Sequence, residues 1–165
     1  MTESIEQLVG ALREEMQQYG EMLALLDHQQ EKVKARCAEE VFRSVSLIES
    51  QAAVLQTVRA HREQCRLSVA RQSASGEEAS FSDLIPLLPA DYRPLVKALV
   101  DENNHLLVRV RQRAHQNHLL LRRSLELMEA LMGTLFSSLQ TSVYNGSGGI
   151  EKHFVETPSL YSSVG

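Results

Sequence analysis

Apolar residues recur at every third or fourth position through most of residues 91–140, the longest helical pattern in the chain. No proline follows Pro94 here and no glycine precedes Gly133, so little interrupts a helix. At 1.5 Å per residue this helix would be roughly 70 Å long, and its apolar stripe must pack on helices of this chain or of a partner. The stripe consists of Val96, Leu99, Leu106, Val110, Ala114, Leu121, Leu125, Met128, Met132, Leu135 and Leu139.

Residues 3–27 show apolar positions at alternating spacings of four and three, which predicts a helix with a heptad seam. We expect a short break at Asp27-His28, followed by a second helix over residues 30–72. Arginine and histidine dilute its stripe beyond Val58, so we expect its end, residues 67–71, to protrude or fray. The first seam is Ile5, Val9, Leu12, Met16, Tyr19, Leu23 and Leu26, and the second is Val33, Cys37, Val41, Val45, Ile48, Ala52, Leu55 and Val58.

A loop over residues 73–80 and two prolines separate the second long helix from the third. Ser80, with Asp83 three residues later, resembles a capping box for a short helix over residues 81–88. Pro89 ends this helix, and Asp91 is placed to cap the long one. Glycines from Gly146 onward cannot continue the long helix.

Together these elements predict an all-α fold, an elongated antiparallel bundle of three long helices with a short extra helix between the second and third. We expect a helical bundle domain over residues 1–141 and a flexible Gly/Ser-rich C-terminal tail over residues 142–165, mobile in isolation.

Composition and charge bear mainly on partners and location. A formal net charge of -4 over 165 residues does not favour a nucleic-acid partner. The N-terminus does not resemble a signal peptide, and no stretch approaches the roughly 20 apolar residues that span a bilayer. We therefore expect a cytoplasmic protein that does not insert into membranes. Acidic side chains dominate residues 3–31 and arginines dominate residues 105–123, so an antiparallel bundle would set these charges together.

Candidate chemistry is sparse, and we expect no enzyme, no metal site and no cofactor. Cys37 and Cys65 would lie about 40 Å apart on one helix, which excludes a disulfide, so both are interpreted as small, partly buried residues. His105, His115 and His118 lie among arginines that oppose a bound cation, which favours solvated histidines. No nucleophile elbow or phosphate-binding glycine loop is readable. The cluster Arg109, Arg111, Arg113, Arg122 and Arg123 is interpreted as a solvated helix face.

Two features of the long helix bear on partner choice. Asn103 and Asn117 fall in its apolar stripe, where they either fix register as buried polar residues or lie half exposed. Its C-terminal half is apolar on more than one face, which favours partner binding over burial within the bundle. Those apolar residues are Leu119, Leu120, Leu121, Leu125, Leu127, Met128, Leu131, Met132, Leu135, Phe136 and Leu139.

Three segments resemble the FlgN-type flagellar export chaperones, and the resemblance covers most of the chain. The first is the N-terminal helix with Glu14-Glu15 and Leu23-Ala24-Leu25-Leu26. The second is the Asn-rich entry Glu102-Asn103-Asn104-His105-Leu106-Leu107. The third is Val143-Tyr144-Asn145-Gly146-Ser147-Gly148, similar to the family's ending after its last helix.

The resemblance implies a helical chaperone that holds C-terminal segments of the hook-filament junction proteins FlgK and FlgL. It implies delivery to the flagellar type III export gate and its ATPase complex, without catalysis. Tyr144, Asn145 and Gly148 would lie in the segment offered to the gate. The implied client-binding face is Leu121, Leu125, Met128, Leu131, Met132, Leu135, Phe136 and Leu139.

Two other functions fit parts of the pattern. A homodimeric coiled coil, acting as a structural or adaptor protein, would bury the same leucines between two copies. A four-helix phosphotransfer domain would use His118, but the leucines that follow it and the lack of an acidic neighbour disfavour this function. The tail after Ile150 either assists client binding or folds back over the helix.

Overall fold

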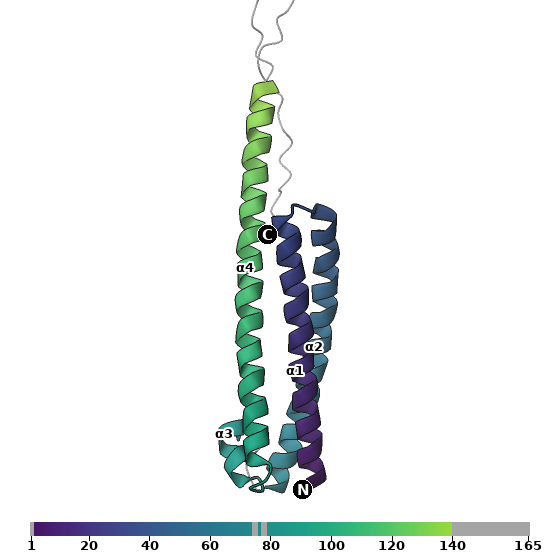
Figure 1. The fold of residues 1–165 in the computed structure, drawn as a ribbon, viewed down its shortest axis with the longest axis vertical. Coiled ribbons are helices and arrows are strands. Elements are labelled where there is room, and N and C mark those ends of the chain that lie inside the picture. Colours follow the sequence, from purple (N-terminus) through teal and green to yellow (C-terminus); the bar gives the residue numbers. More distant parts are fainter. Residues whose placement is uncertain (1, 74–75, 77–78, 140–165) are drawn as a thin grey trace, which may run out of the picture. The chain divides into compact units, whose positions relative to one another are not determined.

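The computed structural model describes residues 2–73, 76 and 79–139, with side chains up to residue 135. Its helices are α1 (Thr2–Lys34), α2 (Ala38–Gln72), α3 (Phe81–Leu84), the 3₁₀ helix η1 (Ile85–Leu87) and α4 (Arg93–Leu139) (Figure 1). The described residues contain no strand. The chain divides into two units, Met1–Arg123 and Ser124–Gly165, with the boundary inside α4. The predicted all-α bundle is confirmed, and the predicted tail lies outside the described residues.

Helices α1 and α2 pack antiparallel along their lengths (Figure 1). Gln72 Nε2 donates to Ser4 Oγ at 2.8 Å, and Gln51 Nε2 donates to Gln18 Oε1 at 2.7 Å, so residues late in α2 lie beside residues early in α1. The predicted seam of α1 is its buried face. One core cluster comprises Ile5, Leu8, Val9, Ala11, Leu12, Cys65, Val69, Ala70, Leu84, Leu88, Val96 and Leu99, and a second comprises Tyr19, Met22, Leu26, Leu55 and Leu106.

Two buried asparagines attach the first part of α4 to α1. Asn103 Nδ2 donates to the Leu12 carbonyl at 2.9 Å, and Asn117 Nδ2 donates to the Leu26 carbonyl at 2.7 Å. Both bonds span the same offset of 91 residues, so within the first unit α4 runs parallel to α1. With exposures of 5 % and 2 %, the two asparagines are buried seam residues.

The predicted break at Asp27-His28 is wrong, because α1 continues to Lys34 and includes residues assigned to the second helix. Polar residues in this stretch contact α4 instead of forming a turn. Arg113 Nε lies 2.8 Å from Asp27 Oδ1, and its Nη1 donates to Gln30 Oε1 at 2.7 Å. The chain turns later, at Arg36, whose φ of 57° is left-handed.

The expected fraying at the end of α2 is also wrong. Val69 and Ala70 are fully buried, and they share a core cluster with Leu84 of α3 and with Leu88. Arg66 is also buried, and its guanidinium binds the Glu63 carboxylate and donates to the Ala79 carbonyl. The sequence pattern counted arginine and histidine beyond Val58 as a dilution of the apolar stripe, whereas Arg66 is itself part of the buried face.

The start of α2 is more exposed than its stripe predicts. Val45 is 38 % exposed, Val41 and Ile48 are half-buried, and Cys37 is exposed at the N-terminal boundary of the helix. Cys65, by contrast, is buried, and both thiols are free.

The connection between α2 and α4 contains the predicted capping box, which Ser80 and Asp83 form at the start of α3. The hydrogen bonds from Ser80 stabilise the ionised carboxylate, so they lower the pKa of Asp83. Helix α4 begins at Arg93, and Asp91, the expected cap, lies in the turn before it.

Replacing Asn103 by alanine should lower the free energy of unfolding by about 1–3 kcal/mol, since it removes two hydrogen bonds and buried volume. Chemical denaturation followed by circular dichroism measures this. The matched control is the exposed neighbour Asn104, whose replacement by alanine should change stability by less than about 0.5 kcal/mol. Equal effects of the two substitutions would contradict the role assigned to Asn103.

Candidate partner-binding surface

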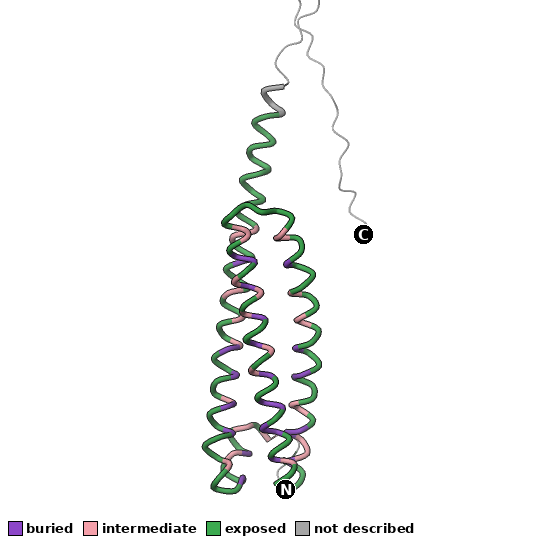
Figure 2. Tube along the Cα trace, turned by 45° about the vertical axis from the view of Figure 1, so that its right-hand side comes forward, coloured by how far each residue is buried: buried purple, intermediate pink, exposed green. Residues whose placement is uncertain are grey.

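The second unit carries a continuous apolar helix face. We call Leu125, Met128, Leu131, Met132 and Leu135 the α4 apolar surface. Leu125, Met128, Met132 and Leu135 follow one another at spacings of three and four, and Leu131 lies three residues after Met128 and four before Leu135, which places all five on one side of the helix. Their exposed fractions are 57 %, 59 %, 59 %, 48 % and 53 %, and every residue over 122–135 is exposed (Figure 2).

A partner that covered this surface would gain a substantial hydrophobic contribution. Burying a whole Leu or Met side chain contributes about 1.5–3 kcal/mol, so covering the exposed half contributes roughly 1 kcal/mol per residue. Five such residues offset part of the entropy lost on association. Methionine adapts to irregular partners, because its side chain is unbranched and flexible.

The structure describes some of the predicted client-binding residues and not others. Leu121 is half-buried within the first unit. Phe136 and Leu139 belong to α4, but their side chains lie outside the described residues. Tyr144, Asn145 and Gly148, predicted to dock at the export gate, also lie outside the described residues.

A cluster of charged residues between α1 and α2 was not anticipated as a site. Glu15 is 4 % exposed, and its Oε2 lies 3.2 Å from Arg62 Nε while its Oε1 lies 3.9 Å from Arg59 Nε. Tyr19 Oη donates to Glu15 Oε1 at 3.2 Å. The sequence feature that could have revealed this cluster is the position of Glu15 among the apolar seam residues of α1, three residues after Leu12 and four before Tyr19.

Burial, charge and hydrogen bonding shift the pKa values of three groups in and near this cluster. Burial raises the pKa of Tyr19, and the neighbouring Glu15 carboxylate raises it further because it opposes a second negative charge. The hydrogen bond from Arg66 lowers the pKa of Glu63. Burial raises the pKa of the Cys65 thiol, which keeps it in its weakly nucleophilic form.

The remaining candidate groups are mostly on the surface. His105, His115 and His118 are exposed, as predicted, and the described residues contain no group of three metal-ligating side chains. Four of the five clustered arginines are exposed, but Arg113 is half-buried and pairs with Asp27. The predicted charge pairing thus joins α1 to α4 at this arginine, whereas Glu15 pairs with α2.

Within the described part of the chain, no helix is apolar over a length that could cross a bilayer.

A helical bundle with one exposed apolar helix face is typical of a protein that binds other proteins. The comparison with known families agrees with this class. A family model described as "FlgN protein" matches residues 1–152, so the chain belongs to the FlgN family, as its resemblance predicted. This is a family of flagellar export chaperones rather than enzymes. No curated protein and no solved structure matches the chain.

Replacing Glu15 by glutamine should lower the free energy of unfolding by about 1–3 kcal/mol, because Arg62 would lose the carboxylate paired with it in a largely buried site. The same change should lower the pKa of Tyr19, since it removes the negative charge beside the phenol. Denaturant titration and ultraviolet titration of the tyrosines measure the two effects. Glu14, whose side chain is 52 % exposed, is the control, and its replacement by glutamine should change neither. An unchanged Tyr19 pKa in the Glu15 variant would contradict the assigned contact.

Proposed function

We propose that the protein is a cytoplasmic chaperone that binds C-terminal segments of FlgK and FlgL and delivers them to the flagellar export apparatus. Family membership supports a role in flagellar export, and the sequence resemblance described above supports these clients. The observation that carries the proposal is the α4 apolar surface, about half exposed at each of its five residues.

The proposed mode of binding is helix against helix. An amphipathic helix of the client lays its apolar face on the α4 apolar surface and forms a mixed bundle with it. A client segment that is disordered before binding loses conformational entropy on docking. The affinity is therefore moderate, and the client can be released for export.

Delivery uses a separate segment of the chain. We propose that Tyr144, Asn145 and Gly148 contact the export gate and that the chaperone works with the export ATPase complex. This assignment depends on the resemblance of residues 143–148 to the ending of the family.

Replacing Leu125, Met128 and Leu135 together by glutamate should abolish capture of FlgK and FlgL C-terminal segments. Each substitution removes roughly 1 kcal/mol of apolar contact and sets a charge against the client, so the Kd should rise by more than about 100-fold. Titration calorimetry measures this. The helical circular dichroism signal should persist, because the three side chains are exposed.

The matched control for this experiment is Val108→Glu. Val108 is 51 % exposed on the same helix but lies in the first unit, outside the α4 apolar surface. It should leave capture unchanged. Capture that survives the triple substitution would show that the client binds elsewhere.

Sedimentation tests the competing homodimer. A chaperone that keeps the α4 apolar surface for clients should sediment as a monomer at micromolar concentration. A stable dimer that the same triple substitution dissociates would favour the structural coiled coil instead.

Replacing Tyr144 by alanine should leave client capture intact and strongly reduce delivery, since the proposal assigns this residue to the gate and not to the client. Client secretion and co-purification, measured in the same cells, separate the two steps. The assignment fails if Tyr144→Ala weakens capture as much as it weakens secretion.

A further inference from the structure

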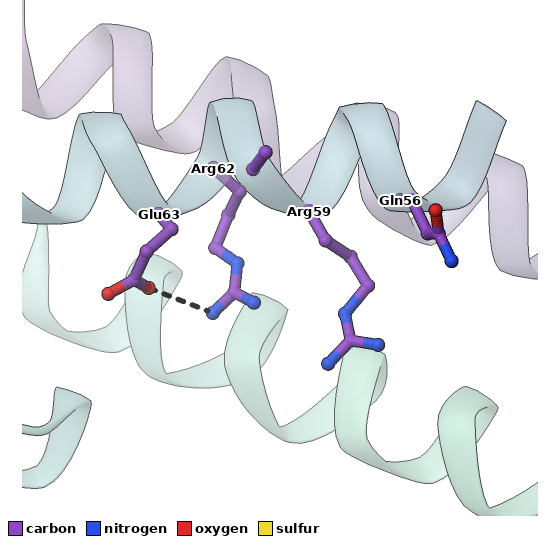
Figure 3. Close-up of a pocket in the computed structure, with 5 residues that line it drawn as sticks. Gln56, Arg59, Arg62 and Glu63 are labelled. Carbon is purple, nitrogen blue, oxygen red and sulfur yellow. Dashed lines mark ion pairs between the residues drawn. The ribbon is translucent and has the colours of Figure 1, made fainter. Parts of the chain in front are cut away.

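The charged hollow on α2 in the first unit has its charges paired within the protein. Arg62 Nη1 lies 3.8 Å from Glu63 Oε2 (Figure 3), and Arg62 Nε lies 3.2 Å from Glu15 Oε2. Arg59 Nε lies 3.9 Å from Glu15 Oε1. Each arginine of the hollow already faces a carboxylate, so the hollow does not select an anion. The α4 apolar surface, by contrast, has no cover among the described residues.

The chain carries an apolar segment that membership of the FlgN family does not account for. The family model matches residues 1–152, whereas apolar side chains continue at Phe154, Val155, Leu160 and Tyr161. Aromatic residues make up only 5 % of the chain, yet Phe154 and Tyr161 both lie in this short stretch. Segments that serve only as linkers are poor in aromatic and β-branched residues, so this composition indicates a segment with apolar surface to bury.

This segment is long enough to reach the α4 apolar surface of its own chain. Both belong to the second unit, and residues 140–149, with three glycines, connect them. A glycine-rich connection of about ten residues has a root-mean-square span of roughly 17 Å. Returning from Leu139 to the level of Leu135 takes about 6 Å along the helix, and crossing to a packed neighbour takes about 10 Å. Residues 150–161, even as a helix, would span about 18 Å, which matches the roughly 15 Å from Leu125 to Leu135.

The covalent connection favours this segment over other covers. A short flexible linker presents its segment at an effective concentration of the order of millimolar, whereas a second copy of the chain at micromolar concentration is roughly a thousandfold more dilute. Charge contributes little, because α4 carries Glu126 and Glu129 while the segment carries Lys152 between Glu151 and Glu156. Apolar contact would therefore supply the stability of the covered state.

We propose that residues 150–161 cover the α4 apolar surface of the same chain when no client is bound, with Ile150, Phe154 and Tyr161 among the contacting side chains. The covered surface is no longer available for self-association. A client must displace the segment, so its apparent affinity falls in proportion to the fraction of chains that are open. This effect on client binding rests on the proposed function, whereas the contact itself does not.

Client titration tests the effect on affinity. The FlgK C-terminal segment is titrated by calorimetry into the wild-type chain and into the double variant Phe154→Ser, Tyr161→Ser. The double variant should bind about three- to tenfold more tightly, since its surface is open in most molecules. Equal affinities would overturn the inference. Weaker binding by the double variant would also overturn it, because the segment would then assist the client.

The matched control is a second double variant, Lys152→Ser, Ser159→Ala, which changes the same segment but keeps its apolar side chains. It should bind the FlgK segment as the wild-type chain does. Tighter binding by this control, equal to that of the first variant, would overturn the role given to Phe154 and Tyr161.

Hydrogen exchange tests the contact without a client. The amides of residues 124–135 should exchange more slowly in the wild-type chain than in the Phe154→Ser, Tyr161→Ser variant, because a covered helix opens less often. Equal exchange would overturn the inference whether or not a client binds. Slower exchange in the wild type, together with no binding of FlgK or FlgL, would support the inference and overturn the proposed function. Protection that disappears on dilution would assign the cover to a second copy and overturn the inference.

Discussion

The fold of the first unit depends on two amide side chains that attach α4 to α1. Asn103 and Asn117 donate to carbonyls of α1 at one shared sequence offset, so a slip of α4 along α1 breaks both bonds together. Each buried amide left without its partner costs about 1–3 kcal/mol, whereas leucines in a seam tolerate sliding. Hydrogen bonding therefore sets the register of α4, and apolar burial supplies most of the stability.

The register between the helices determines which polar side chains lie opposite one another. Asp27 and Gln30 meet Arg113, which lets α1 continue as a helix through a stretch that reads as a turn. Glu15 meets two arginines of α2 inside the seam. Such pairs contribute little net stability when a desolvation cost offsets them, but they penalise every alternative alignment.

The exposed apolar face of the second unit suits an adaptable binder. Contacts to Leu125, Met128 and their neighbours are non-directional, so that surface would accept amphipathic helices of differing sequence.

The sequence by itself determined the all-α class, the seam of α1, the capping box at Ser80 and the apolar character of the end of α4, because each follows from local periodicity or neighbouring residues. It misplaced the first turn by several residues, and from the arginines and histidine that dilute the stripe beyond Val58 it predicted a frayed end of α2 that is in fact buried. Whether Asp27 or Arg66 ends a buried stretch depends on which residue of another helix lies opposite, and periodicity within one helix does not contain that information. The tertiary structure alone decided the burial of Asn103 and Asn117 and the meeting of Glu15 with Arg62, since these contacts join residues far apart in the chain.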